Sequence, residues 1–127
     1  MSRKKYQPTN SELEILSVLW ETGDSTAREV HNHLEQVKST GYTTTLKIIQ
    51  NMFDKGLLTR TAKGQTHLYS PLVKREDIQK NLLGGFVQKV FGGSSKNMIL
   101  QALGNETPSK EELDEIRAML DNLENKK

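Results

Sequence analysis

Hydroxyl and basic side chains gather on one face of an expected helix in the stretch TGYTTTLKIIQNMFDKG. With about 100° of rotation per residue, Thr44, Lys47 and Asn51 fall within a wedge of about 60°, and Thr43 lies beside them. Threonine can hydrogen-bond several base edges, and lysine can reach guanine or a phosphate. This combination is typical of a helix that reads the major groove of DNA. Tyr42, which directly precedes the cluster, is a further candidate for DNA contact.

The same threonines have a plainer interpretation as a helix cap. Serine and threonine clusters start many helices, because their hydroxyls accept hydrogen bonds from the first free backbone N–H groups. Thr45 lies nearer the apolar side of the helix and is expected to pack against it. This helix alone supports two interpretations equally. It is either an ordinary helix with a solvated face and a threonine-rich cap, or a helix that reads DNA.

A basic hairpin is expected directly after this helix. LLTRTA alternates as a strand, KGQ is typical of a turn, THLYS returns as a second strand, and Pro71 ends it. Arg60, Lys63 and His67 on this hairpin are expected to contact phosphates beside the helix. From residue 36 to residue 63 there are five lysines and arginines against one acidic residue. The combination of helix and basic hairpin favours the DNA interpretation.

Two further helices are expected to support the reader. The first is capped by Thr9 with Glu12 and ends at Gly23, and the second starts near Ser25 or Thr26, where Glu29 completes a capping box. Ser25 and Thr26 are candidate DNA contacts. The expected apolar faces are, in chain order, Leu13, Leu16, Leu19 and Trp20; Ala27, Val30, Leu34 and Val37; and Leu46, Ile49, Met52 and Phe53.

Three helices and a two-stranded hairpin, in this order, predict a winged helix. The fold class is therefore mainly α with a small β-hairpin, and we expect a DNA-binding domain over residues 1–72. The basic segment Arg3-Lys4-Lys5 is either an arm that contacts DNA or a tail without a role. We expect Trp20 in the core, and His31 and His33 on the surface.

Residues 73–127 are expected to form a helical dimerisation region. An amphipathic pattern runs from residue 74 to 91, a short segment follows FGGSS, and a last helix starts at Ser109 with Glu112 as its capping partner. Isolated helices of this length cannot build a full core, so pairing with a second copy is favoured over packing back onto the winged helix. The candidate dimer residues are Leu82, Phe86, Val90, Phe91, Ile99, Leu103, Leu113, Ile116 and Leu120.

Composition excludes several other classes of protein. The sequence has no cysteine and only three histidines, which excludes disulfides and thiolate metal sites, so neither a metal nor another cofactor is expected. Glycine-rich phosphate loops, a nucleophile elbow and the HExxH pattern are absent from the sequence, so we expect no enzyme. The basic N-terminus is not followed by an apolar segment, and a cytoplasmic location is expected.

Several segments together resemble the penicillinase and methicillin-resistance repressors, the BlaI/MecI type. They are PTNSELEILSVLWETGDSTAREV, TTTLKIIQNMFDKGLLTR, LYSPLV, KVFGGSSKNMILQAL and EELDEIRAML, and they span almost the whole chain. The resemblance implies a dimeric winged-helix repressor that binds an inverted-repeat operator in double-stranded DNA. By position it implies base contacts by Thr43, Thr44 and Lys47, phosphate contacts near Ser25 and Thr26, and a wing contact by Lys63. Leu46 departs from the polar residue common in the family.

The resemblance also bears on how such a repressor is released. In that family a membrane-bound metalloprotease sensor leads to cleavage at an Asn-Phe bond in the dimerisation region. The matching positions here are Gln101 and Ala102, so the family's cleavage pair is absent. A winged helix that binds proteins and not specific DNA is the alternative function, because a fold alone does not fix a function.

Overall fold

The computed structural model describes residues 7–125, which contain six helices and one two-stranded hairpin. The expected fold class is confirmed. The elements, in chain order, are α1 (Asn10–Thr22), α2 (Ala27–Glu35), α3 (Tyr42–Asp54), β1 (Leu58–Lys63), β2 (Thr66–Pro71), α4 (Arg75–Val90), α5 (Ser95–Asn105) and α6 (Lys110–Asn125). The chain divides into two compact units between Leu82 and Leu83. Arg3, Lys4 and Lys5 lie outside the described residues.

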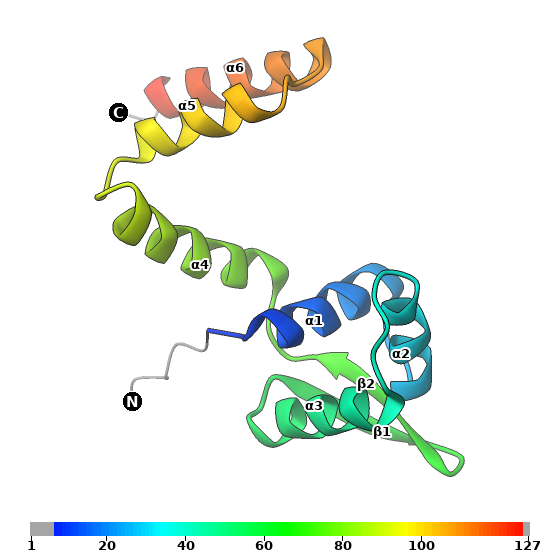
Figure 1. Ribbon diagram of the computed structural model, residues 1–127. Coiled ribbons are helices and arrows are strands. Elements are labelled where there is room, and N and C mark those ends of the chain that lie inside the picture. The colour runs from blue at the N-terminus through cyan, green and yellow to red at the C-terminus, as the bar shows by residue number, and fades with distance from the viewer. Residues whose placement is uncertain (1–6, 126–127) are drawn as a thin grey trace. The chain divides into compact units, whose positions relative to one another are not determined.

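The first unit is a winged helix whose core lies between α1, α2, α3 and the hairpin (Figure 1). All three helices and both strands contribute buried side chains, namely Ile15, Leu16, Leu19, Ala27, Val30, Ile49, Met52, Leu57, Leu58 and Tyr69. Trp20, expected in the core, is half-buried against this cluster, and its Nε1 donates to the carbonyl oxygen of Val73 at 3.2 Å. Ile15, which the sequence analysis left out, is 1% exposed.

Capping fixes the ends of α1 and α2 as the sequence predicts. Thr9 and Glu12 form a reciprocal capping box at the start of α1, and Thr26 and Glu29 form another at the start of α2. Gly23 ends α1 with a φ of 84°, a conformation that costs little only for glycine. Residues close to each helix end therefore determine where α1 begins and ends and where α2 begins.

Val37 does not belong to the apolar face of α2. This helix ends at Glu35 with Gln36 as its C-cap, so Val37 lies in the following loop, where it is 87% exposed. The helical period that predicted its burial does not extend past the cap.

The wing is an antiparallel hairpin whose strands pair from Leu58 with Pro71 to Lys63 with Thr66. Its turn consists of Gly64 and Gln65, and Gly64 has a φ of 59°. Lys63 therefore lies at the end of β1 and not in the turn itself. Tyr69 also exchanges backbone hydrogen bonds with Ser25, which joins the loop before α2 to the hairpin.

An ion pair between a buried carboxylate and an exposed lysine joins the start of α1 to the end of α3. Glu12 is 5% exposed, and its carboxylate accepts a hydrogen bond from Lys55 Nζ at 2.6 Å. Burial by itself raises the pKa of Glu12. The hydrogen bond from Lys55, the backbone hydrogen bond from Thr9 and the charge of Lys55 outweigh this effect, so the pKa of Glu12 lies below its usual range.

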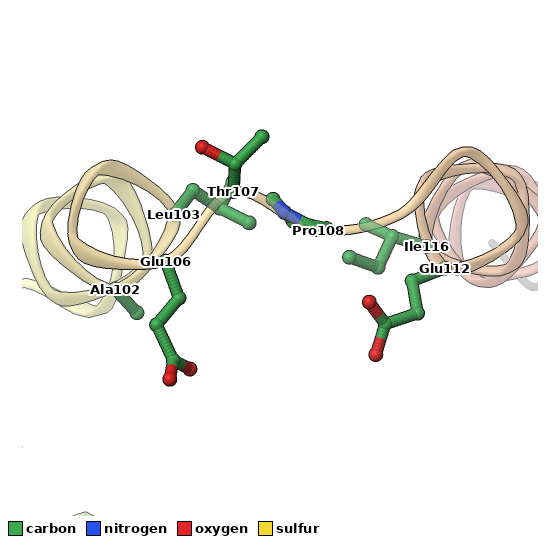
Figure 2. A pocket seen from close by; sticks show the side chains of 7 residues that line it. All are labelled: Ala102, Leu103, Glu106, Thr107, Pro108, Glu112 and Ile116. Carbon is green, nitrogen blue, oxygen red and sulfur yellow. The ribbon is translucent and has the colours of Figure 1, made fainter.

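Helices α5 and α6 contain no buried residue. A hollow between them is lined by Ala102, Leu103, Glu106, Thr107, Pro108, Glu112 and Ile116, and the carboxylates of Glu106 and Glu112 point to the same side of the connecting loop (Figure 2). Ser109 and Glu112 form the expected reciprocal pair of cap hydrogen bonds at α6. Within residues 7–125, no helix is long and apolar enough to cross a bilayer.

Candidate nucleic-acid interface

Helix α3 begins at Tyr42, directly before the threonine cluster, and the threonines do not cap it. The N-cap is Gly41, which has no side chain to accept a hydrogen bond, and Tyr42 is the first helical residue. The part of the plainer interpretation that makes the threonines a cap is therefore wrong, and the choice between a solvated face and a DNA reader stays open at this point. Thr43 and Thr44 lie in the first turn and are exposed.

The expected polar face of α3 is present. Thr43, Thr44, Lys47 and Asn51 are all exposed. Within the described part of the chain, none of these four side chains has an intramolecular hydrogen bond or ion pair. The opposite side of α3 is anchored by Ile49 and Met52, which are 1% and 0% exposed. The helix is thus fixed by one side, and the other side presents hydroxyl, amide and ammonium groups to a ligand.

Thr45 and His31 form a buried polar contact between α2 and α3. Thr45 is 1% exposed, as its position near the apolar face predicts. His31 is 6% exposed, so the expectation that it lies on the surface is wrong. Its Nδ1 lies 3.2 Å from Thr45 Oγ1, and its Nε2 lies 3.6 Å from a carboxylate oxygen of Glu35. His33, on the far side of α2, is exposed as expected.

His31 is buried because it occupies the flank of α2 that faces the start of α3. Its ring meets the ring of Tyr42 edge to face, with centroids 5.5 Å apart and an angle of 84° between the planes. Arg28, one turn earlier, places its guanidinium carbon 3.8 Å from the centroid of the Tyr42 ring. Arg28 is not among the residues predicted from the sequence. The spacing of Arg28 and His31 at i and i+3 on α2 was the available signal.

Ser25 and Thr26 occupy the start of α2 with different roles. Ser25 is 5% exposed, and its hydroxyl donates to the carbonyl oxygen of Gly23 at 2.9 Å. This buried side chain positions the loop before α2, and its contact with DNA stays a prediction. Thr26 is half-buried, and its Oγ1 accepts a hydrogen bond from the backbone N–H of Glu29.

Two of the three basic side chains expected on the wing are exposed, and the third is half-buried. Lys63 is exposed at the end of β1. Arg60 is exposed and places its guanidinium carbon 4.0 Å from the centroid of the Phe53 ring on α3. His67 is half-buried, and its Nδ1 is buried without a hydrogen-bond partner among residues 7–125. Because side chains alternate along a strand, His67 shares a face with buried Tyr69, and its contact with a phosphate stays a prediction.

The positive charge of Lys63 acts on the start of α2. The backbone N–H of Thr26 donates to the Glu29 carboxylate at 2.8 Å and holds the pKa of Glu29 below its usual range, and the charge of Lys63 adds to this effect. The charge of Lys63 at the end of β1 therefore reaches Glu29 in the first turn of α2. Among residues 7–125, no cluster of histidine and acidic side chains has the size needed to hold a metal ion.

The side chains predicted for dimerisation are partly or largely accessible. Phe86, Val90, Ile99 and Leu120 are 49%, 59%, 49% and 55% exposed. The other five are half-buried, namely Leu82, Phe91, Leu103, Leu113 and Ile116. Gln101 and Ala102, which the resemblance matches to the family's cleavage pair, are exposed within α5.

Two solved structures share the fold. The solution structure of the DNA-binding domain of the repressor BlaI matches with a TM-score of 0.53 and 24% identity, covering 60% of this chain and 93% of that domain. A MarR family protein from Bacillus stearothermophilus matches with a TM-score of 0.56 and 22% identity, covering 95% of this chain and 76% of that protein. These likenesses support the winged-helix architecture.

Curated relatives match along nearly the full length. The penicillinase repressor of Staphylococcus aureus is 23% identical over 126 residues, which cover 99% of this chain and 100% of the relative. The methicillin resistance regulatory protein MecI of Staphylococcus aureus strain N315 is 25% identical over 120 residues, which cover 94% of this chain and 98% of the relative. The family model of the penicillinase repressor matches residues 8–122. The chain belongs to the penicillinase repressor family.

Proposed function

We propose that this protein is a DNA-binding transcriptional repressor that acts in the cytoplasm and reads its operator with α3. The observation that carries the proposal is the exposed face of Thr43, Thr44, Lys47 and Asn51, which has no internal partner among the described residues. Each of these side chains can bond base edges or phosphates when the helix enters a major groove. Membership of the penicillinase repressor family supports the same function.

The wing supplies contacts that position the protein without reading sequence. Lys63 and Arg60 are exposed cations on the hairpin that follows α3, and we assign them to phosphates. Thr26 adds a hydroxyl at the start of α2. These contacts release counterions, so we expect binding to weaken steeply as the salt concentration rises.

We further propose that the repressor binds an inverted repeat as a homodimer, with DNA-binding and dimerising functions divided near residues 72 and 73. The support is the exposure of Phe86, Val90, Ile99 and Leu120 on helices that bury few residues within one chain. Burying one such side chain contributes about 1.5–3 kcal/mol. In a symmetric dimer each such side chain is buried twice, once in each copy, so its contribution to the free energy of association counts twice. The dimer also has the twofold symmetry of an inverted repeat.

A mobility-shift titration tests this function. DNA from the region upstream of the protein's own gene is titrated with the full chain over a series of salt concentrations, with random-sequence DNA as competitor. The proposal expects a complex that resists the competitor and contains two chains per DNA fragment. Weak binding that is equal on both DNAs, or a complex with a protein partner that occupies the Thr44 face, would contradict sequence-specific repression and favour a protein-interaction module.

A further inference from the structure

Three arginines of the described residues lie over aromatic rings, but their surroundings differ. Arg75 lies 5.4 Å from the centroid of the Trp20 ring, and its guanidinium also donates to the Glu21 carboxylate at 3.1 Å. Arg28 lies closer to its ring, 3.8 Å from the centroid of Tyr42. Within residues 7–125, Arg28 has no carboxylate at ion-pair distance. Its positive charge is therefore fixed in place and available to an anion from outside the chain.

The ring beneath Arg28 is held from a second side. His31 meets the Tyr42 ring edge to face, and the buried contact between His31 Nδ1 and Thr45 Oγ1 ties that histidine to α3. Tyr42 is the first residue of α3, directly before Thr43 and Thr44. Arg28 is therefore held beside the end of α3 that carries the proposed reading residues.

Stacking leaves the donors of a guanidinium free. The five N–H groups of arginine lie in the guanidinium plane, so a ring packed against one face of that plane does not occupy them. A planar arginine can donate two parallel hydrogen bonds to the oxygens of one phosphate. Because the ring limits the side chain's freedom before binding, less conformational entropy is lost when the contact forms.

We propose that Arg28 clamps a DNA phosphate beside the start of α3, and that Tyr42 acts as a positioning residue that holds the guanidinium for this contact. The inference rests on the proposed function, because it assumes that α3 docks onto duplex DNA. It replaces the expectation that Tyr42 itself contacts DNA. The clamp carries no sequence information, so it contributes equally on operator and random DNA.

The test measures the salt dependence of binding to random-sequence duplex DNA by fluorescence anisotropy with the full-length chain. Loss of one phosphate contact reduces the slope of log K against log salt by about 0.9. We expect this reduction for Arg28→Ala and for Arg28→Gln, which keeps much of the side-chain length. The matched control Arg75→Ala removes an arginine that also lies over a ring but already has a carboxylate partner, and its slope is expected to equal that of the wild type.

A double-mutant cycle tests the role of Tyr42. We expect Tyr42→Leu to weaken binding by about two- to fivefold, the range for an exposed cation–π contact. In the Arg28→Ala background, Tyr42→Leu is expected to have no further effect. In the otherwise wild-type chain, Tyr42→Phe keeps the ring and is expected to retain wild-type affinity. Thermal unfolding of each variant separates these effects from loss of folded protein.

The outcomes separate the clamp from the wider function. A wild-type slope in Arg28→Ala and Arg28→Gln overturns the clamp and leaves the repressor function intact. An equal loss for Tyr42→Leu with and without Arg28 overturns the positioning role. Absence of any salt-dependent binding by the wild type overturns both the clamp and the proposed function.

Discussion

At the scale of single residues, the exposed face of α3 follows from sequence and the buried contacts beside it do not. Thr44, Lys47 and Asn51 were placed together by helical rotation alone, and all three are exposed. His31 was misplaced because its burial depends on Tyr42 and Thr45, which lie on another helix. A polar side chain on the flank of a helix is buried only where another element packs against it. The helical period of its own segment does not indicate which element that is.

Thr44 is expected to read sequence, whereas Lys63 is expected to add affinity without selectivity. Removing the Thr44 hydroxyl and methyl by Thr44→Ala should reduce the preference for operator over random DNA by about 1 kcal/mol. Lys63→Ala should weaken both DNAs by a similar factor, because it removes a phosphate contact. Competition experiments by fluorescence anisotropy with both DNAs measure, for each variant, the ratio of its affinity for the operator to its affinity for random DNA. An unchanged preference in Thr44→Ala would remove Thr44 from the reading residues.

The ion pair of Glu12 and Lys55 predicts a specific pH dependence of stability. The pKa of Glu12 is lower in the folded chain than in the unfolded chain. The ionised carboxylate therefore stabilises the fold at neutral pH, and this contribution is lost as the pH falls through and below the usual glutamate pKa of about 4.3. Glu12→Gln, which keeps a capping side chain, should lower the free energy of unfolding by about 1 kcal/mol at pH 7 and flatten its decline in acid.

Urea unfolding at several pH values measures this effect. Glu14→Gln is the matched control, because the Glu14 carboxylate lies 3.3 Å from Lys38 Nζ in an exposed pair, which contributes little to stability. The same acid decline in Glu12→Gln and in the wild type would contradict a stabilising role for the pair of Glu12 and Lys55.

At the scale of elements, the sequence predicts the helix caps and the hairpin turn, but it predicts the exact ends of the helices less well. Thr9, Thr26 and Ser109 carry local signals that act within three residues, and the structure has all three caps. The end of α2 has no glycine or proline to mark it, which is why Val37 was counted inside the helix. Gly41 caps α3 through its backbone conformation, a feature that favours no particular side chain.

The cap of α2 gives a prediction at this scale. Thr26→Ala removes the hydroxyl that accepts a hydrogen bond from the backbone N–H of Glu29, and it should lower the free energy of unfolding by about 1 kcal/mol. Thr61→Ala, at an exposed position on β1, serves as the control and should change it by less than about 0.5 kcal/mol. Urea midpoints at an unchanged m-value report the difference. Equal midpoints for the two variants would show that the capping box does not stabilise α2.

At the scale of the whole molecule, the sequence predicts two kinds of region, and we propose that the second is completed by a second copy of the chain. The first unit has a continuous apolar core. Helices α5 and α6 have no buried residue, so their apolar side chains follow the helical period without a core of their own. In the proposed dimer a second copy covers them, and the sequence indicates this surface only through the leucine, isoleucine and phenylalanine side chains that the helical period places together.

Charges on this apolar surface should separate the dimer. Leu120→Asp and Phe86→Asp each place two carboxylates in the proposed interface and should weaken dimerisation by about a hundredfold or more. Val37→Asp is the matched control, because Val37 is apolar and 87% exposed but lies outside the proposed interface. Sedimentation equilibrium measures the dimer constant. A wild-type protein that is monomeric at all concentrations, or variants that dimerise unchanged, would contradict the proposed interface.

The most direct test of the central claim is a hydroxyl-radical footprint of the wild-type protein on DNA from its own upstream region. The account predicts two protected half-sites related by an inverted repeat, with centres separated by one helical turn of about 10 base pairs or a multiple of it. It also predicts that Thr44→Ala loses this pattern at protein concentrations where the wild type gives it. Uniform protection without half-sites, or no protection in a fragment that the protein nevertheless binds, would contradict a dimeric repressor that reads DNA through α3.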